Sequence, residues 1–147
     1  MNWLPLRIYR HVAAHVPLLC VDGIIGYEGK FLLLKRQIPP YQNRWWVPGG
    51  RVRKGERLAV AFRRILRAEV GIIVEDFTLA GIFEVHHLSP DTGIPGGRHV
   101  VSVVFETSLP TGATITLDKQ HSAWRWAARL PRDFWLQESG SWRRRLW

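Results

Sequence analysis

Hydrophobic residues along the chain fall into two kinds of segment, one with a strand-like pattern and one with helical spacing. The strand-like runs are rich in leucine, β-branched and aromatic side chains and end at turn-forming residues. The connection Tyr27-Glu28-Gly29 joins the first two runs and is typical of a hairpin. Trp124 and Trp126 also alternate in a strand-like pattern. Strands are therefore predicted over residues 18–26, 30–36, 45–47, 77–87 and 99–107.

Three further segments favour helices. The clearest contains Ala59, Phe62 and Leu66 at helical intervals. Helices are predicted over residues 55–69, 130–138 and, unless it forms an extended arm, 6–15. Together with the strands, these segments predict an α+β fold.

Turn-rich segments connect these elements without a clear domain linker or internal repeat. Residues 89–97 are expected to form a mobile loop and residues 109–118 an irregular connection. The chain is predicted to form one domain over residues 1–147, with an N-terminal arm or helix at 1–16 and a loosely docked basic tail at 142–147.

Composition excludes several classes of protein. The chain has no apolar run of about 18 residues, so no membrane-spanning helix is expected. Arg and His interrupt the first residues, which makes them a poor signal peptide. The single cysteine, Cys20, cannot form an internal disulfide, and its apolar neighbours indicate a buried thiol. These features favour the cytoplasm.

The net charge of +9 indicates an anionic partner. A basic cleft would attract a polyanionic nucleotide, and a basic surface would bind nucleic acid. The charge is not concentrated in one long tract, and no nucleic-acid-binding motif is present. A small anionic substrate is therefore favoured over nucleic acid.

One face of the helix predicted over 55–69 carries a single carboxylate. Positions 65, 68 and 69 lie close together on that face, but only Glu69 is acidic. Magnesium prefers oxygen ligands and is often held by one or two carboxylates together with substrate phosphates. The sequence therefore predicts about one bound ion. The alternative is an ordinary amphipathic helix whose arginines face solvent.

The stretch from residue 50 to residue 72, GRVRKGERLAVAFRRILRAEVGI, resembles the Nudix box. Ile65 and Ala68 stand where that box has two of its glutamates. An aromatic–apolar–Pro–Gly–Gly turn, residues 46–50, leads into the motif. The positions that keep the frame are Gly50, Glu56, Arg64, Leu66, Glu69, Gly71 and Ile72.

From about residue 17 to residue 126, the chain resembles the GDP-mannose mannosyl hydrolases, a Nudix branch that lacks the same two carboxylates. The matching positions are 21–22, 31–36, 46–52, 61–62, 64, 68–69, 71, 118–121 and 124–126. The resemblance implies a Nudix fold with a mixed β-sheet between helices, and a homodimer. It also implies hydrolysis of GDP-mannose, and to some extent GDP-glucose, to GDP and free hexose. Water would attack the anomeric carbon with inversion, with one Mg²⁺, or Mn²⁺, in each active site.

The resemblance also assigns roles to individual residues. The metal ligands would be the Glu69 carboxylate, the Gly50 carbonyl and the Gln120 side chain. His121 would be the general base, a task that suits a side chain titrating near neutral pH. Asp22 would stabilise positive charge on the sugar. The residues expected to stabilise the departing diphosphate, or to orient Glu69, are Arg36, Arg51 and Arg64.

Three departures from the branch leave parts of this assignment open. A site histidine is expected at His87, with His86 as the alternative. Val100 stands where the branch has a tyrosine, and His99 is a candidate to replace its contact with substrate. The 89–97 loop differs in length and content, so the preferred base and sugar stay open.

Two other functions stay open. A Nudix pyrophosphohydrolase would cleave a nucleotide sugar or nucleotide at phosphorus. A non-catalytic nucleotide-binding module would bind without cleavage.

Overall fold

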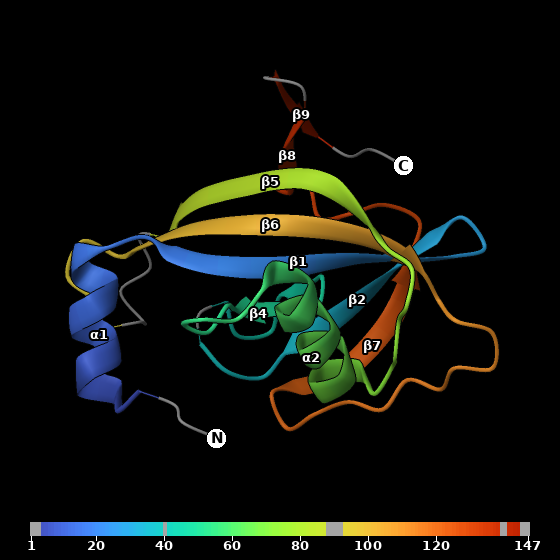
Figure 1. Ribbon diagram of the computed structural model, residues 1–147, viewed down its shortest axis with the longest axis horizontal. Coiled ribbons are helices and arrows are strands. Elements are labelled where there is room, and N and C mark those ends of the chain that lie inside the picture. Colours follow the sequence, from blue (N-terminus) through green and yellow to red (C-terminus); the bar gives the residue numbers. More distant parts are fainter. Residues whose placement is uncertain (1–3, 40, 88–92, 139–140, 145–147) are drawn as a thin grey trace.

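The computed structural model describes residues 4–39, 41–87, 93–138 and 141–144. A mixed sheet forms the body of the molecule, with the long strands β1, β6 and β5 side by side (Figure 1). Helix α2 lies against one side of the sheet, and α1 stands at one end. The elements are α1 Leu6–His15, β1 Leu18–Tyr27, β2 Lys30–Arg36, β3 Trp45–Trp46, β4 Gly49–Arg51, α2 Leu58–Val70, β5 Thr78–His87, β6 Arg98–Ser108, β7 His121–Ala127, β8 Trp135–Glu138 and β9 Ser141–Arg144.

The sheet order is β3-β2-β1-β6-β5-β8-β9, with β4 paired to β1 and β7 paired to β2. Only β1 and β6 run parallel among the pairs found, so the predicted α+β class with a mixed sheet is confirmed. The β1–β2 hairpin is also confirmed, and its tight turn uses positive φ at Glu28 and Gly29.

Strand β1 changes partners along its length, and this opens the sheet. At its end, Gly26 and Tyr27 pair with β2. Near its start, residues 20–22 pair instead with β4. The rest of β2 pairs with β7. One branch of the sheet therefore consists of β2 and β7 and the other of β1 and β4, and the two separate around Asp22. Most of the functional residues predicted above lie around this opening.

Helix α2 presents a buried apolar stripe to the sheet. The stripe includes Phe62, which lies so close to Gly23 that a Cβ there would approach its ring to 2.7 Å. Ile65, in place of a box glutamate, is buried in the same core. The helix ends at Gly71, which adopts the left-handed conformation common after a helix.

The helix predicted over 130–138 is wrong. Residues 131–134 form a turn, closed by the Phe134 N–H donating to the Pro131 carbonyl at 2.9 Å, and β8 follows as a strand paired to β5. Leu130 and Phe134 are buried in the second core cluster, where the Phe134 ring stacks on Phe83. The second side of the sheet is thus packed by a turn whose apolar side chains replace those of a helix.

The remaining segment predictions have mixed outcomes. Residues 6–15 form the helix, not the extended arm, and 109–118 is an irregular connection. In the predicted loose tail, residues 142–144 instead belong to β9, paired with β8. Residues 145–147 and 88–92 lie outside the described residues, and the predicted mobile loop falls partly in the second of these ranges. No helix in the described part of the chain is long and apolar enough to cross a membrane.

Candidate active site

A pocket of about 550 Å³ lies where the sheet opens. It brings together residues from β1, β2, β4, the end of α2 and the start of β7, with α1 along one side. The predicted site residues that line it are Asp22, Arg36, Gly50, Arg51, Glu69, Gln120 and His121. Residues separated by up to a hundred positions in the sequence therefore meet in one cavity.

Glu69 is the acidic centre of this pocket. Its Oε2 accepts a hydrogen bond from the Gly49 N–H at 3.0 Å, which fixes the carboxylate beside β4. Burial is the main cause that raises the pKa of Glu69 to about 8, and the negative charges of Asp118 and Asp22 contribute to this increase. Burial and nearby negative charge both disfavour the ionised form of Glu69. A bound cation would offset this effect, so the site favours one.

Asp118 lies beside two residues of the pocket, Glu69 and His121, and its role was not predicted from the sequence. The Asp118 N–H donates to the Glu69 carbonyl at 3.1 Å, and this bond ties the 109–118 connection to the end of α2. One ligand atom from each of Glu69, Asp118 and His121 lies within 4.8 Å of the others. These three side chains, two of which line the pocket, could therefore hold a divalent metal.

His121 is buried, and Asp118 determines its orientation. The His121 Nδ1 lies 2.8 Å from the Asp118 Oδ1, and the Gln120 N–H donates to the same oxygen at 3.0 Å. We assign the proton to Nδ1, since the ionised carboxylate is an acceptor. The Nε2 atom is then left as a proton acceptor, as a general base requires.

Asp22 faces Gly49 across the β1–β4 pair. A Cβ at Gly49 would lie 1.6 Å from the Asp22 Oδ1, so only glycine leaves room for this carboxylate. Burial raises the pKa of Asp22 to about 6, although the Ser102 hydroxyl and the Arg36 guanidinium lower it in part. Asp22 is thus ionised mainly above this pH.

Basic side chains line the pocket beside these carboxylates. Burial lowers the pKa of Arg36, while the charge of Glu69 raises it. The Arg51 guanidinium lies 4.4 Å from the centre of the Tyr9 ring, and Arg98 Nη1 donates to the Tyr9 hydroxyl at 3.1 Å. The buried Nε of Arg98 has no hydrogen-bond partner among the described residues. This cationic wall suits the phosphates of a nucleotide.

Sequence reasoning missed Tyr9 and Arg98. Tyr9 reaches the site only because α1 packs against the ends of β1 and β6. Arg98 follows a glycine-rich turn like many surface arginines, so its pattern carries no signal of a site.

The sequence model of the NUDIX domain matches residues 10–130. The chain belongs to the Nudix family. It is 35% identical over 119 residues to the low-salt glycan biosynthesis protein Agl8 of Haloferax volcanii, covering 81% of this chain and 76% of that protein. It is 37% identical over 99 residues to an ADP-ribose pyrophosphatase of Methanocaldococcus jannaschii, covering 67% of this chain but only 52% of that protein.

A solved structure confirms the Nudix fold. The MutT NUDIX hydrolase from Burkholderia pseudomallei superposes with a TM-score of 0.65 at 28% identity. The match covers 78% of this chain and 84% of the other. The protein is therefore a Nudix hydrolase. Its pocket lies beside the C-terminal end of α2, the helix of the Nudix box.

Arg64, although part of the Nudix box, does not line the pocket. Its Nε and Nη2 donate to the two Glu56 carboxylate oxygens at 2.6 and 2.8 Å, and Nη2 also donates to the Arg51 carbonyl at 3.0 Å. These bonds attach β4 to α2. The geometry supports a positioning role for Arg64, through the strand that carries Gly50 and Arg51.

The predicted histidines of β5 and β6 contribute no described side chain to the pocket. Val100 lines the pocket. The preceding residue, His99, lies on the other face of the sheet and contacts Glu84. His99 is therefore not placed to replace the tyrosine contact of the GDP-mannose branch. His86 lies opposite His99 in the sheet, and His87 lies opposite Arg98. The His87 side chain lies outside what the structure describes.

Proposed function

We propose that this Nudix hydrolase cleaves a GDP-sugar, GDP-mannose and also GDP-glucose, into GDP and free hexose. The observation that carries the proposal is the buried His121, held through Nδ1 by Asp118 beside Glu69, the one carboxylate among positions 65, 68 and 69. This arrangement supplies a general base but few acidic metal ligands. It suits attack by water on the anomeric carbon, with inversion, better than chemistry that needs several metals.

The residues beside Glu69 would hold one Mg²⁺, with Mn²⁺ as an alternative. The ligands would be Glu69, the Gly50 carbonyl and the Gln120 side chain. The fit rests on Glu69, whose pKa is raised by burial and neighbouring carboxylates, so that a cation would relieve an unfavourable charge. When bound, the metal would neutralise charge on the diphosphate and make it a better leaving group.

The protein's own residues account for the remaining steps. His121 Nε2 takes a proton from water while the water oxygen bonds to the anomeric carbon. The bond between that carbon and the diphosphate oxygen breaks, and the electron pair leaves with GDP. Asp22 stabilises positive charge on the sugar, while the arginines that line the pocket stabilise the diphosphate. Among the arginines that line the pocket, we assign this role to Arg36, Arg51 and Arg98.

Cys20 also lines the pocket, but it does not suit covalent catalysis. Burial and the charge of Asp22 raise the pKa of its thiol to about 12. A thiol that stays protonated is a poor nucleophile. The free cysteine is consistent with a cytoplasmic protein, and we propose that location. We also propose that the protein is a homodimer.

Hydrolysis of GDP-mannose in ¹⁸O-labelled water with Mg²⁺ tests the proposed reaction. Mass spectrometry should find the label in the hexose, and proton NMR should show the inverted anomer as the first product. The Glu69→Gln variant should lose most metal-dependent turnover and serves as the matched control. Label in a phosphate group would reject carbon attack.

Attack at phosphorus is the second candidate function, favoured by the similarity to an ADP-ribose pyrophosphatase. ADP-ribose and GDP-mannose should be compared in the same labelled-water assay. Faster cleavage of ADP-ribose to AMP, with label in phosphate, would support this candidate. Binding of either nucleotide without turnover would instead support a non-catalytic binding module.

A further inference from the structure

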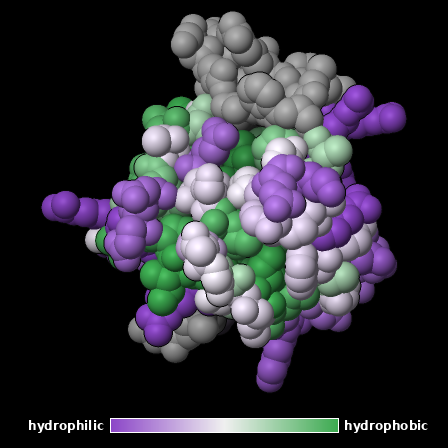
Figure 2. All heavy atoms as spheres, turned by 90° about the vertical axis from the view of Figure 1, so that its right-hand side faces the viewer, coloured by the Kyte–Doolittle hydropathy of each residue, from purple (hydrophilic) through white to green (hydrophobic). Residues whose placement is uncertain are grey.

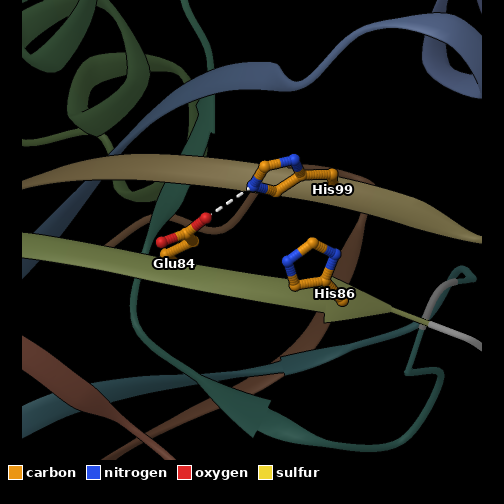
Figure 3. A group of neighbouring side chains, drawn as sticks. All are labelled: Glu84, His86 and His99. Carbon is orange, nitrogen blue, oxygen red and sulfur yellow. Dashed lines mark hydrogen bonds and ion pairs between the residues drawn. The ribbon is translucent and has the colours of Figure 1, made fainter.

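A second group of metal-binding side chains lies on the other side of the sheet from the pocket. Glu84 and His86 project from β5, and His99 projects from the neighbouring strand β6 (Figure 3). His86 and His99 are directly opposed in the antiparallel register. Glu84 lies on the same face as His86, because residues two apart in a strand point the same way.

The three side chains are already close together. The His99 Nε2 lies 2.8 Å from the Glu84 Oε1, and the rings of His86 and His99 stack with centroids 4.2 Å apart. One ligand atom from each of the three residues lies within 4.8 Å of the other two. Ligand atoms around a tetrahedral zinc ion are about 3.3 Å apart, as bonds of about 2.0–2.1 Å require. Small rotations of these side chains would therefore complete the geometry.

The chemistry of this group differs from that of the pocket. Two imidazoles and one carboxylate are ligands typical of zinc and other borderline transition metals, whereas magnesium prefers oxygen ligands alone. The Glu84 and His99 side chains are 41% and 31% exposed, so an ion can reach them from solvent. We propose that Glu84, His86 and His99 form a surface Zn²⁺ site, with water completing the coordination.

Alternation along the strands makes this site independent of the pocket. Phe83, Val85 and Val100 line the pocket, whereas Glu84, His86 and His99 alternate with them on the opposite face. The proposal therefore does not depend on the reaction of the enzyme. Because the ion would join β5 to β6, its binding should also stabilise the folded chain.

Titration calorimetry of the metal-free full chain with ZnCl₂, in excess Mg²⁺, tests the site. Wild type should bind one Zn²⁺ at this group, and the double substitution His86→Ala with His99→Ala should weaken that binding at least ten-fold. Glu84→Gln should weaken it less, because both imidazoles remain. Circular dichroism should show that the variants are folded.

Two controls separate this site from other places where Zn²⁺ could bind. His11 and His15 lie four residues apart on α1 with ring centroids 4.5 Å apart, and Glu69 is the acidic centre of the pocket. The double substitution His11→Ala with His15→Ala, and the separate Glu69→Gln, should leave this binding event unchanged. Binding that survives loss of His86 and His99, or disappears in either control, would overturn the proposal.

Imidazole NMR of the wild-type chain provides a measurement that does not depend on variant folding. Substoichiometric Zn²⁺ should shift the ring signals of His86 and His99 before those of His11, His15 and His121. Shifts confined to the other histidines would also overturn the proposal.

Discussion

At the scale of single residues, the chemistry of the pocket resides in pairs of side chains. Asp118 orients His121, the absence of a side chain at Gly49 leaves room for Asp22, and Gly49 also donates to Glu69. Each pair joins a residue with a proposed chemical role to one that gives it a position or a protonation state. A substitution of the positioning residue, Asp118 or Gly49, should therefore affect catalysis although that residue does not contact the substrate.

His121→Gln should lower kcat by about 10²–10⁴ and change KM only a few-fold, because the proposed base meets water and not the diphosphate. Asp118→Asn should lower kcat less, since the base remains but its tautomer is no longer fixed. Steady-state kinetics with GDP-mannose measures both. Arg36→Gln provides the contrast, with an increase in KM expected from weaker diphosphate binding. An unchanged kcat in His121→Gln would place the base elsewhere.

At the scale of elements, two attachments hold the pocket together. The Glu56–Arg64 pair joins the turn before α2 to the helix itself, and Arg64 continues to the carbonyl of Arg51 in β4. At the other side, Tyr9 brings α1 against the arginines of β4 and β6. Each attachment joins a helix to strand residues that line the pocket.

The Glu56–Arg64 attachment should produce a pH dependence of stability. The hydrogen bond from Arg64 lowers the pKa of Glu56 from 4.5 to about 2. A depressed carboxyl pKa stabilises the fold above the unfolded value and loses that effect as pH falls from about 4.5 towards about 2. Urea unfolding should find Glu56→Gln less stable than wild type by about 1–3 kcal/mol at pH 7. This difference should shrink at pH 3, whereas an equal difference at both pH values would contradict the assignment.

The contact between α1 and the pocket should be visible in substrate binding. Tyr9→Phe removes the hydroxyl that accepts from Arg98 but keeps the ring beneath Arg51, so KM should rise by about five-fold, as for loss of about 1 kcal/mol. Tyr9→Ala removes both contacts and should raise KM further, with a smaller effect on kcat. The pair of variants separates the hydroxyl from the ring. Equal KM values in wild type and Tyr9→Ala would show that α1 does not organise the arginines.

At the scale of the whole molecule, the positive charge has both local and distributed parts. Arginines concentrate in the pocket, where they suit a diphosphate. On the face seen in Figure 2, hydrophilic side chains project from several sides around a hydrophobic area instead of forming one continuous patch. The arginines of the pocket therefore suit a small anionic substrate.

The proposed homodimer can be tested through the exposed apolar residues of the N-terminal segment. Leu4, Leu6 and Ile8 are 46%, 59% and 40% exposed, and such residues commonly form interfaces. Light scattering at micromolar concentration should give a dimer mass, and Ile8→Asp should shift it towards the monomer. Val60→Asp, at a similarly exposed position on α2, should leave the dimer intact. A monomer mass for wild type would contradict the proposal.

The sequence by itself determined the elements whose pattern is local. The apolar stripe of α2 and the turn at residues 28–29 follow from side-chain spacing and backbone preferences over a few residues. The resemblance to the Nudix box likewise pointed to Glu69 and Gly50, because both occupy matching positions of that motif. Most of the predicted pocket residues could therefore be named from the chain alone.

Only the tertiary structure decided which distant residues meet and which face each one occupies. Asp118 reaches Glu69 because the 109–118 connection folds back on the end of α2, and Tyr9 reaches Arg98 because α1 packs on the sheet. His99 faces away from the pocket because the register of β6 gives that face to Val100. Residues 135–138 form a strand and not a helix because β5 offers its backbone as a partner. These outcomes depend on long-range packing and pairing, which override local propensity.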